Sequence, residues 1–255
     1  MRGSPVSREA FAFARNFAVA SPSELSVEQH YLLCSSRGAL RLEAHGNVWV
    51  LPPARAALIA AGEVIQVAIP QPVTTSSVLF DPGFAPPPPA PLTVFDLSPL
   101  ARALVMECVA WPDADEPLPA YARSVFGALA AVAWRLAEHP SPVTVPAGRS
   151  PELRRALALT EDGLVEDLRF EDIAHAVGLA PRSLARRFEE ECGLTWSAVV
   201  RRKRVVRAIE RLAMNEDSVT TIAHAVGYTS LSAFNAAFRD LTGRTPTQYR
   251  ATFRT

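Results

Sequence analysis

The sequence contains an internal repeat in its C-terminal part. The six residues Ile173-Ala174-His175-Ala176-Val177-Gly178 return without change at residues 222–227, 49 positions later. After a one-residue insertion the match continues at a spacing of 50, with Leu184 corresponding to Phe234. A six-residue identity followed by matching positions in register is not expected by chance. The sequence therefore predicts one short structural unit that is folded twice.

Each copy has the pattern of two short helices joined by a glycine-centred turn. Gly178 and Gly227 stand where the first helix must end in a left-handed residue. Pro181 suits the first turn of the next helix, because its φ angle is fixed and its missing donor is not needed there. This arrangement is the helix-turn-helix unit. A long helix over residues 196–214 is predicted between the copies and would fix their relative orientation.

The second helix of a helix-turn-helix unit enters the major groove of DNA with its early residues at the base edges. These helices are predicted over residues 181–192 and 230–241. Arginine can bind guanine O6 and N7 together, which makes Arg182 and Arg186 candidate base readers. In the second copy Asn235 could read adenine and Leu231 a thymine methyl group. The candidate DNA contacts are Arg182, Ser183, Ala185, Arg186 and Arg187, then Ser230, Leu231, Ser232, Asn235, Ala236 and Arg239.

The charge distribution agrees with a local DNA-binding surface. The chain has 26 Lys and Arg against 26 Asp and Glu, so a uniformly basic protein is excluded. Between Arg182 and Arg211, however, nine cations face four acids, a local excess of five positive charges. Arg201 and Arg202 in this segment are predicted phosphate contacts. The alternative is a solvated helix face.

These C-terminal hundred residues resemble the AraC/XylS family of bacterial transcription regulators. The resemblance implies two helix-turn-helix units on a long helix, inserted into successive major-groove segments on one DNA face. It also implies base reading by Arg182, Ala185 and Arg186, then by Leu231, Ser232, Asn235 and Ala236. The residues that carry the resemblance in and after the first copy are 172–174 with 178, 183–188, 192–195, and 204–208 with 212. Those in and after the second copy are 222–223, 226–230, 232–234, 237–238, 243–246 and 249–250.

The segment over residues 29–80 is predicted to form strands. Leu40, Leu42 and Ala44 alternate with Arg41 and Glu43, which is the period of a half-buried strand. Short apolar stretches separated by turn signals indicate a small antiparallel barrel or sandwich. Its far end is predicted at the proline-rich stretch 86–91, an extended spacer.

These strands resemble the cupin-type effector domain that often accompanies the family, through residues 30–38 and 49–53. Metal-binding cupins use a His-x-His pair and a later histidine. Here His30 stands alone near the first motif, and Ile65 occupies the later position. We therefore expect no metal and no cofactor, and we expect His30 and His45 to be ordinary, partly exposed histidines. Any pocket would bind an organic effector, or nothing.

The segment 98–139 is predicted to be helical. Val125, Leu129, Val132 and Leu136 form one apolar stripe at helical spacing. The stripe either packs on the β domain or forms a helix–helix dimer seam, and both can hold. A second linker follows over residues 140–149.

The predicted fold is therefore α+β with two domains, an N-terminal antiparallel cupin-like barrel plus helices and a C-terminal all-α double helix-turn-helix domain. The expected boundaries are 1–97 for the effector domain, 98–139 for the helical dimerisation segment, 140–149 for the linker and 150–255 for the DNA-binding domain. The expected function is sequence-specific transcription regulation, modulated by a small molecule or by dimerisation. Expected partners are double-stranded DNA, a second copy, an effector, and RNA polymerase if the protein activates.

Cysteine use and hydropathy suit a cytoplasmic protein without membrane spans. Cys34, Cys108 and Cys192 lie far apart and are odd in number, which excludes a disulfide framework. No apolar run approaches the roughly 18 residues that a bilayer requires. Two alternatives remain, a cupin-type enzyme with a helical appendage and a cysteine redox switch. The sequence lacks an evident metal site or acid–base pair for the first.

Overall fold

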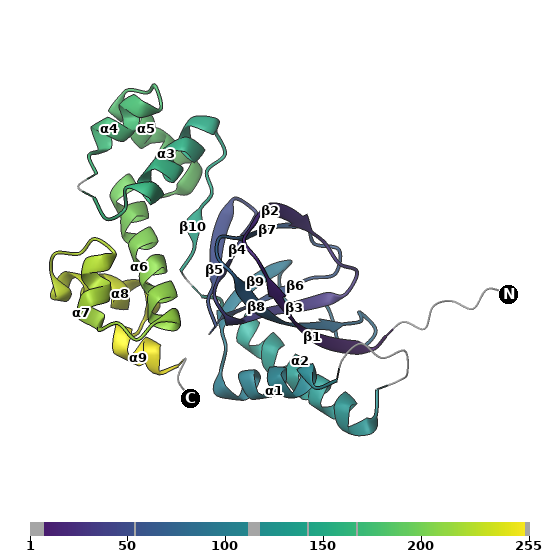
Figure 1. Cartoon of the computed structure of the whole chain (residues 1–255). Helices are drawn as coiled ribbons and strands as arrows, with labels where there is room; N and C mark the ends of the chain where they lie inside the picture. The colour runs from purple at the N-terminus through teal and green to yellow at the C-terminus, as the bar shows by residue number, and fades with distance from the viewer. Residues whose placement is uncertain (1–7, 54, 112–117, 142, 167, 253–255) are drawn as a thin grey trace. The chain divides into compact units, whose positions relative to one another are not determined.

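The structure is a computed structural model that describes residues 8–53, 55–111, 118–141, 143–166 and 168–252. It divides into two compact units (Figure 1). One is formed by Met1–Leu42 and Leu51–Ser141, and the other by Glu43–Val50 and Pro142–Arg254. The first is built on strands and two helices, and the second is largely helical. The α+β class is confirmed.

The strands form two antiparallel sheets of five strands each. The first has the order β1-β8-β3-β6-β9 and the second β10-β5-β4-β7-β2. The bounds in the first sheet are β1 Ala10–Phe17, β3 His30–Arg37, β6 Arg55–Ile59, β8 Val73–Phe80 and β9 Leu92–Asp96. Those in the second are β2 Ala20–Leu25, β4 Leu40–Ala44, β5 Asn47–Leu51, β7 Ile65–Ile69 and β10 Val145–Pro146.

Four strands lie outside the predicted segment 29–80. They are β1, β2, β9 and the two-residue β10. The proline-rich stretch does not end the β fold, because β9 follows it and pairs with β6 from Arg55↔Asp96 to Ile59↔Leu92. Arg55 is buried, and its Nε donates to Asp96 Oδ1 at 3.1 Å, which adds a charge-assisted bond to this pairing. The stretch is also anchored, since Trp134 Nε1 donates to the Pro86 carbonyl at 3.0 Å.

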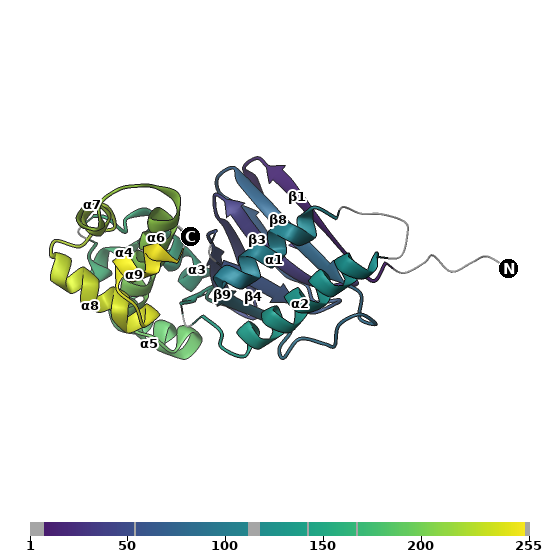
Figure 2. The same ribbon diagram turned by 90° about the horizontal axis from the view of Figure 1, so that it is seen from below.

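Two helices cover one face of the first sheet (Figure 2). They are α1 (Pro99–Val109), capped by the Ser98 hydroxyl, and α2 (Ala120–Ala137). The predicted apolar stripe is on α2 and packs into the core that these elements share. Val125 and Leu129 are buried there, and Val132 and Leu136 are partly buried. The stripe therefore packs on the sheet, and its buried members are not available to a dimer seam.

His30 is buried, so the expectation of a partly exposed side chain was wrong. It begins β3 in the middle of the sheet, and Trp134 of α2 covers it edge-on with ring centroids 6.1 Å apart. Its Nδ1 accepts the backbone N–H of Ala61 at 3.1 Å, and its Nε2 is buried without a partner. Burial lowers the pKa of His30, although the nearby Asp81 carboxylate opposes this.

The second unit is a series of short helices around one long helix. Its elements are α3 Pro151–Asp162, α4 Phe170–Ala176, α5 Pro181–Cys192, α6 Trp196–Met214, α7 Val219–Ala225, α8 Leu231–Thr242 and α9 Pro246–Ala251. The predicted bounds of α5 and α6 are confirmed, and α8 starts one residue later than expected because Ser230 is its N-cap. Gly178 and Gly227 have φ angles of 74° and 89°, the predicted left-handed conformation.

Each helix-turn-helix unit has its own small core. In the first, Leu184 and Phe188 of α5 are buried against α3, α4 and the start of α6. In the second, the Phe238 ring lies 5.7 Å from Phe234 and 5.5 Å from Tyr249 of α9. The Thr245–Gln248 capping box fixes the start of α9. These buried faces turn the remaining residues of α5 and α8 outward.

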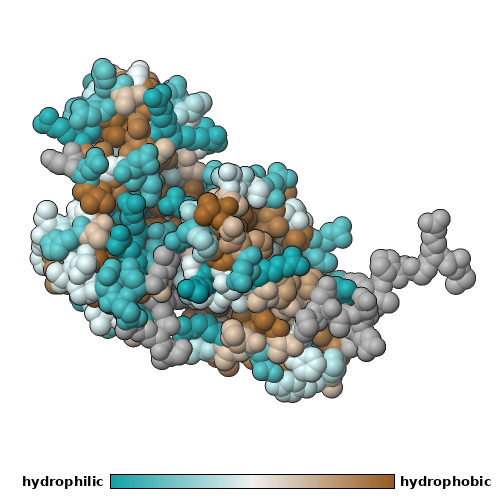
Figure 3. All heavy atoms as spheres, in the orientation of Figure 1, coloured by the Kyte–Doolittle hydropathy of each residue, from teal (hydrophilic) through white to brown (hydrophobic). Residues whose placement is uncertain are grey.

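The visible surface is mixed, with hydrophobic patches among hydrophilic side chains on both units (Figure 3). The large exposed apolar residues of the described segments include Leu100 and Met106 on α1 and Tyr121 on α2. Within the described residues, no helix combines the length and hydropathy needed to cross a membrane.

His30 predicts a loss of stability in mild acid. Its folded-state pKa lies below the unfolded value of about 6.5, so protonation favours the unfolded chain. Its contribution is full above about pH 6.5 and is lost as the pH falls below that value. His30→Asn keeps an acceptor for Ala61 without titrating, and should flatten the pH dependence of the urea midpoint between about pH 7.5 and 5. His45→Asn, at an exposed histidine, is the control. An equal flattening in this variant would contradict the attribution of the pH dependence to His30.

Candidate nucleic-acid interface

The first recognition helix, α5, presents two arginines on an exposed face. Arg182 is exposed in its first turn, and the Arg186 side chain is 73% exposed one turn later. The contact of Arg186 with Glu190 on the same helix is loose, at 3.8 Å between Nε and Oε1. Ser183 and Ala185 beside them are half-buried. Two guanidinium groups are thus free to meet a ligand in front of α5.

Arg187 does not share this face. Its Nη1 donates to Glu152 Oε2 of α3 at 3.1 Å and lies 3.9 Å from Glu191 Oε1. Its side chain is only 32% exposed. Helical spacing alone made Arg187 a candidate DNA contact. The structure gives it a bond that holds α5 against α3.

Glu191 is a structural residue of the interface that the sequence pattern missed. Its Oε2 accepts the backbone N–H groups of Arg149, at 2.6 Å, and Ser150, at 2.8 Å, and its Oε1 accepts the Ser150 hydroxyl at 2.6 Å. Burial raises the pKa of Glu191, but these bonds and Arg187 outweigh it, so the pKa is lowered overall. The carboxylate thereby fixes the end of α5 to the start of α3.

The second recognition helix, α8, has an exposed face of a different character. Its N-cap, Ser230, receives the Ala233 N–H, and the hydroxyls of Ser230 and Ser232 lie 2.8 Å apart. Asn235 is half-buried. The exposed predicted contacts on this helix are Ser230, Leu231, Ser232, Ala236 and Arg239. Short hydroxyl and apolar groups dominate, so this face offers fewer donors than α5.

Most cations of the basic segment on α6 have partners within the unit. Arg201 pairs with Asp240 of α8 at 3.2 Å, with about half of its side chain exposed. Arg202 donates to the Thr144 carbonyl at 3.3 Å. Lys203 is buried and bonds Glu161 of α3 at 2.6 Å. The local excess of five charges therefore overstates the charge that this segment presents to solvent.

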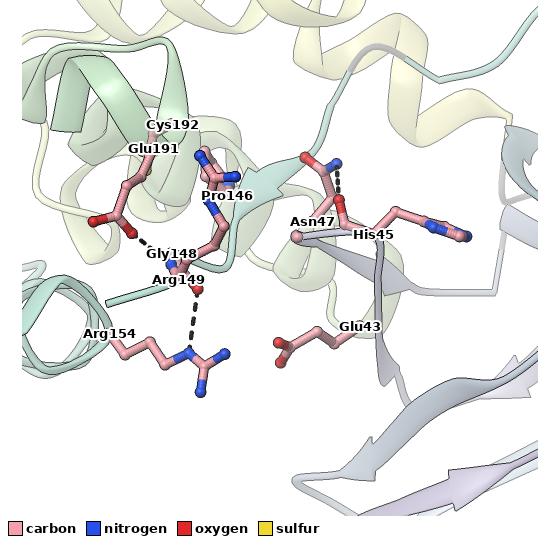
Figure 4. A pocket seen from close by; sticks show the side chains of 10 residues that line it. Glu43, His45, Asn47, Pro146, Gly148, Arg149, Arg154, Glu191 and Cys192 are labelled. Atoms are coloured by element: carbon pink, nitrogen blue, oxygen red, sulfur yellow. Dashed lines mark hydrogen bonds between the residues drawn. The ribbon is translucent and has the colours of Figure 1, made fainter. Parts of the chain in front are cut away.

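The second unit also contains a cavity of about 600 Å³ (Figure 4). Arg154 Nε donates to the Gly148 carbonyl at 3.2 Å at its edge, and Asn47 Nδ2 donates to the His45 carbonyl at 3.3 Å. Arg149 and Arg154 face it together with Glu43 and Glu191, so guanidinium and carboxylate groups are balanced. The lining is polar and shows no preference for one sign of charge.

The described residues give no support to metal chemistry or to a reactive thiol. No group of three or more His, Cys, Asp or Glu among them is arranged to hold a metal ion. Burial raises the pKa of Cys34 and Cys108 to about 12 and that of Cys192 to about 11. A raised pKa favours the protonated thiol near neutral pH, and the protonated thiol is a poor nucleophile.

Two helix-turn-helix units on one long helix, each with the outer face of its second helix exposed, define a DNA-binding domain of the helix-turn-helix class. Residues 173–252 match a family model described as a helix-turn-helix domain. The regulatory protein PocR of Salmonella typhimurium is 33% identical over 105 residues, which cover 41% of this chain and 35% of PocR. The transcriptional regulator NimR of Escherichia coli is 24% identical over 229 residues, covering 88% of this chain and 82% of NimR.

A crystal structure of an AraC-type transcriptional regulator from Chromobacterium violaceum is 32% identical, covers 40% of this chain and 92% of that one, and has a TM-score of 0.40. The chain spans about a third of the length of PocR and of the RhaS activators that it also matches. Through its C-terminal domain, the chain belongs to the AraC/XylS family. The resemblance of the C-terminal hundred residues to this family is confirmed.

The geometry around Glu191 predicts an effect on stability. Glu191→Ala leaves two backbone N–H groups and the Ser150 hydroxyl without their acceptor, and should lower the free energy of unfolding by about 1–3 kcal/mol. Glu190→Ala, on the same helix but exposed, should change it by less than about 0.5 kcal/mol. Urea unfolding of both variants measures the difference. Equal values would mean that the Glu191 bonds add nothing.

Proposed function

We propose that the chain is a sequence-specific DNA-binding transcription regulator that reads two successive major-groove segments, one with α5 and one with α8. The observation that carries this is the pair of recognition helices, each buried on one face and exposed on the other, joined by the uninterrupted helix α6. On this proposal the protein is not an enzyme and needs no cofactor, and it acts in the cytoplasm.

The two helices would read DNA differently. Arg182 and Arg186 suit guanine, because a guanidinium group can bind O6 and N7 together. On α8, Leu231 suits a thymine methyl group and Asn235 an adenine, while Ser230, Ser232, Ala236 and Arg239 complete the contact surface. The operator would therefore have one guanine-containing half and one half richer in A·T pairs. Ser183 and Ala185 would lie against the first half.

Three of the predicted DNA contacts take narrower roles. Arg201 keeps an exposed side chain beside α8 and suits a phosphate, with Arg202 as a weaker candidate. Arg187 would act by holding α5 in place, since its guanidinium group already bonds Glu152.

The first unit would serve as the regulatory part. Residues 1–97 would form the cupin-like effector domain, 98–139 the dimerisation segment, 140–149 the linker and 150–255 the DNA-binding domain. The exposed Leu100, Met106 and Tyr121 support a dimer contact through α1 and the start of α2, because large apolar groups on a surface favour association. A small molecule bound by one state more tightly would shift regulation, and an activator would contact RNA polymerase.

Replacing one base-reading arginine should relax specificity at one position. An operator is first selected from a random DNA library with the full-length protein. Arg186→Ala should then weaken binding by about 1–3 kcal/mol and lose discrimination at a single base pair, measured by fluorescence anisotropy on all single-base variants. Arg187→Ala is the comparison, and should lower stability without relaxing any one position. Equal loss for Arg186→Ala on every sequence would make Arg186 a phosphate contact.

The affinity for the selected operator should also depend steeply on salt. Each neutralised phosphate releases counterions, so the logarithm of the binding constant falls linearly with the logarithm of salt concentration. Titrations between about 50 and 200 mM salt measure the slope. A slope near zero, or a failure to select any sequence, would overturn the proposed function.

A further inference from the structure

Arg204 lies on α6 at the point where both helix-turn-helix units come together. Its Nε donates to the carbonyl of Leu164, in the loop that follows α3, at 3.1 Å. Its guanidinium group lies over the ring of Tyr228, in the turn between α7 and α8, with Cζ 5.6 Å from the ring centroid. One side chain thus contacts the first helix-turn-helix unit through Leu164 and the second helix-turn-helix unit through Tyr228.

Gly227 is packed into the same junction. A Cβ atom at this residue would lie 2.8 Å from the Leu164 oxygen and 3.0 Å from Arg204 Cζ. The first contact is with a backbone atom, which cannot move aside easily. Gly178, the equivalent glycine of the first copy, has nothing within 4 Å of its Cβ position. The left-handed turn alone therefore explains why residue 178 is glycine. Gly227 in addition permits a close approach of the two helix-turn-helix units.

The two copies differ at the next position as well. Tyr228 corresponds to Leu179, which packs against the core of the first helix-turn-helix unit. The Tyr228 ring instead lies between Arg204 and Phe234, with ring centroids of the aromatic pair 5.4 Å apart. Phe234 is a buried residue of α8. Contacts therefore run from Leu164 through Arg204 and Tyr228 to the second recognition helix.

A cavity lies beside this junction. It has a volume of about 320 Å³. It is lined by Leu168 of the first helix-turn-helix unit, by Trp196 and Val200 of α6, and by Tyr228 of the second helix-turn-helix unit. Arg204 itself also lines this cavity, so it borders space that side chains leave unfilled.

We propose that Arg204 is a positioning residue that fixes the separation and rotation of α5 relative to α8, and so determines which spacing between the two halves of an operator the protein accepts. The second part rests on the proposed DNA-reading function. The planar guanidinium group suits this task, because it donates in one direction while it stacks on an aromatic ring.

The test uses the full-length protein and the selected operator, with the two halves moved apart or together by one or two base pairs. The wild type should prefer one spacing sharply. Arg204→Met should flatten this preference by about tenfold while binding to the α5 half-site alone stays unchanged. Arg204→Lys keeps a donor and a cation but loses the planar group, so its preference should lie between those of the wild type and Arg204→Met. Tyr228→Leu, the residue of the first copy, should flatten it, and Tyr228→Phe should not, because the Tyr228 hydroxyl has no partner.

Lys203→Met is the matched control, since it removes the neighbouring bond to Glu161 of α3 but leaves Arg204 in place. It should lower stability and keep the spacing preference. A parallel fall of affinity at every spacing in Arg204→Met, or the same flattening in Lys203→Met, would overturn the proposal.

A measurement without DNA separates this proposal from the proposed function. Spin labels at residues 186 and 239, in a full-length protein whose native cysteines are replaced by alanine, report the distance between α5 and α8. Arg204→Met should broaden the distance distribution, and Lys203→Met should not. An unchanged distribution would overturn the positioning role. A wild type that selects no operator would overturn the DNA-reading function, while the label distances would still decide whether Arg204 sets the geometry.

Discussion

The continuity of α6 is the constraint on which the helical unit depends. At 1.5 Å per residue its 19 residues span about 28 Å, which is comparable to the ~34 Å repeat of a DNA turn. Its start packs into the core of the first helix-turn-helix unit through Trp196 and Val199, and it also packs against α7, α8 and α9. Because the cores of both helix-turn-helix units are built on α6, the position of each recognition helix depends on it.

Local backbone chemistry explains why so much of the helical unit was predictable. Glycines with left-handed φ angles and a proline in a first turn mark the ends of helices wherever they occur, so α5 and α6 could be delimited from the sequence. The partners of Arg187 and Arg204 were not predictable in this way. Their bonds join residues 35 and 40 positions apart, which no helical period describes.

The β unit was less predictable because its strands pair over long distances and its sequence signals are weak. Strand β2 contains a proline and is exposed along most of its length, and β9 follows four consecutive prolines. Each becomes a strand through its partner rather than through its own sequence pattern: β2 pairs with β7, and β9 pairs with β6. His30 shows the same limit, since its burial depends on Trp134, more than a hundred residues away in the chain.

The contrast between Gly178 and Gly227 separates the two copies of the repeat by their tolerance of substitution. The two turns differ in how closely each approaches the rest of the domain. A substitution in the first turn disturbs only its own backbone, whereas one in the second pushes against Leu164 and Arg204. A change of residue at the first turn therefore leaves the packing of the two helix-turn-helix units on each other intact, whereas a change at the second turn alters it.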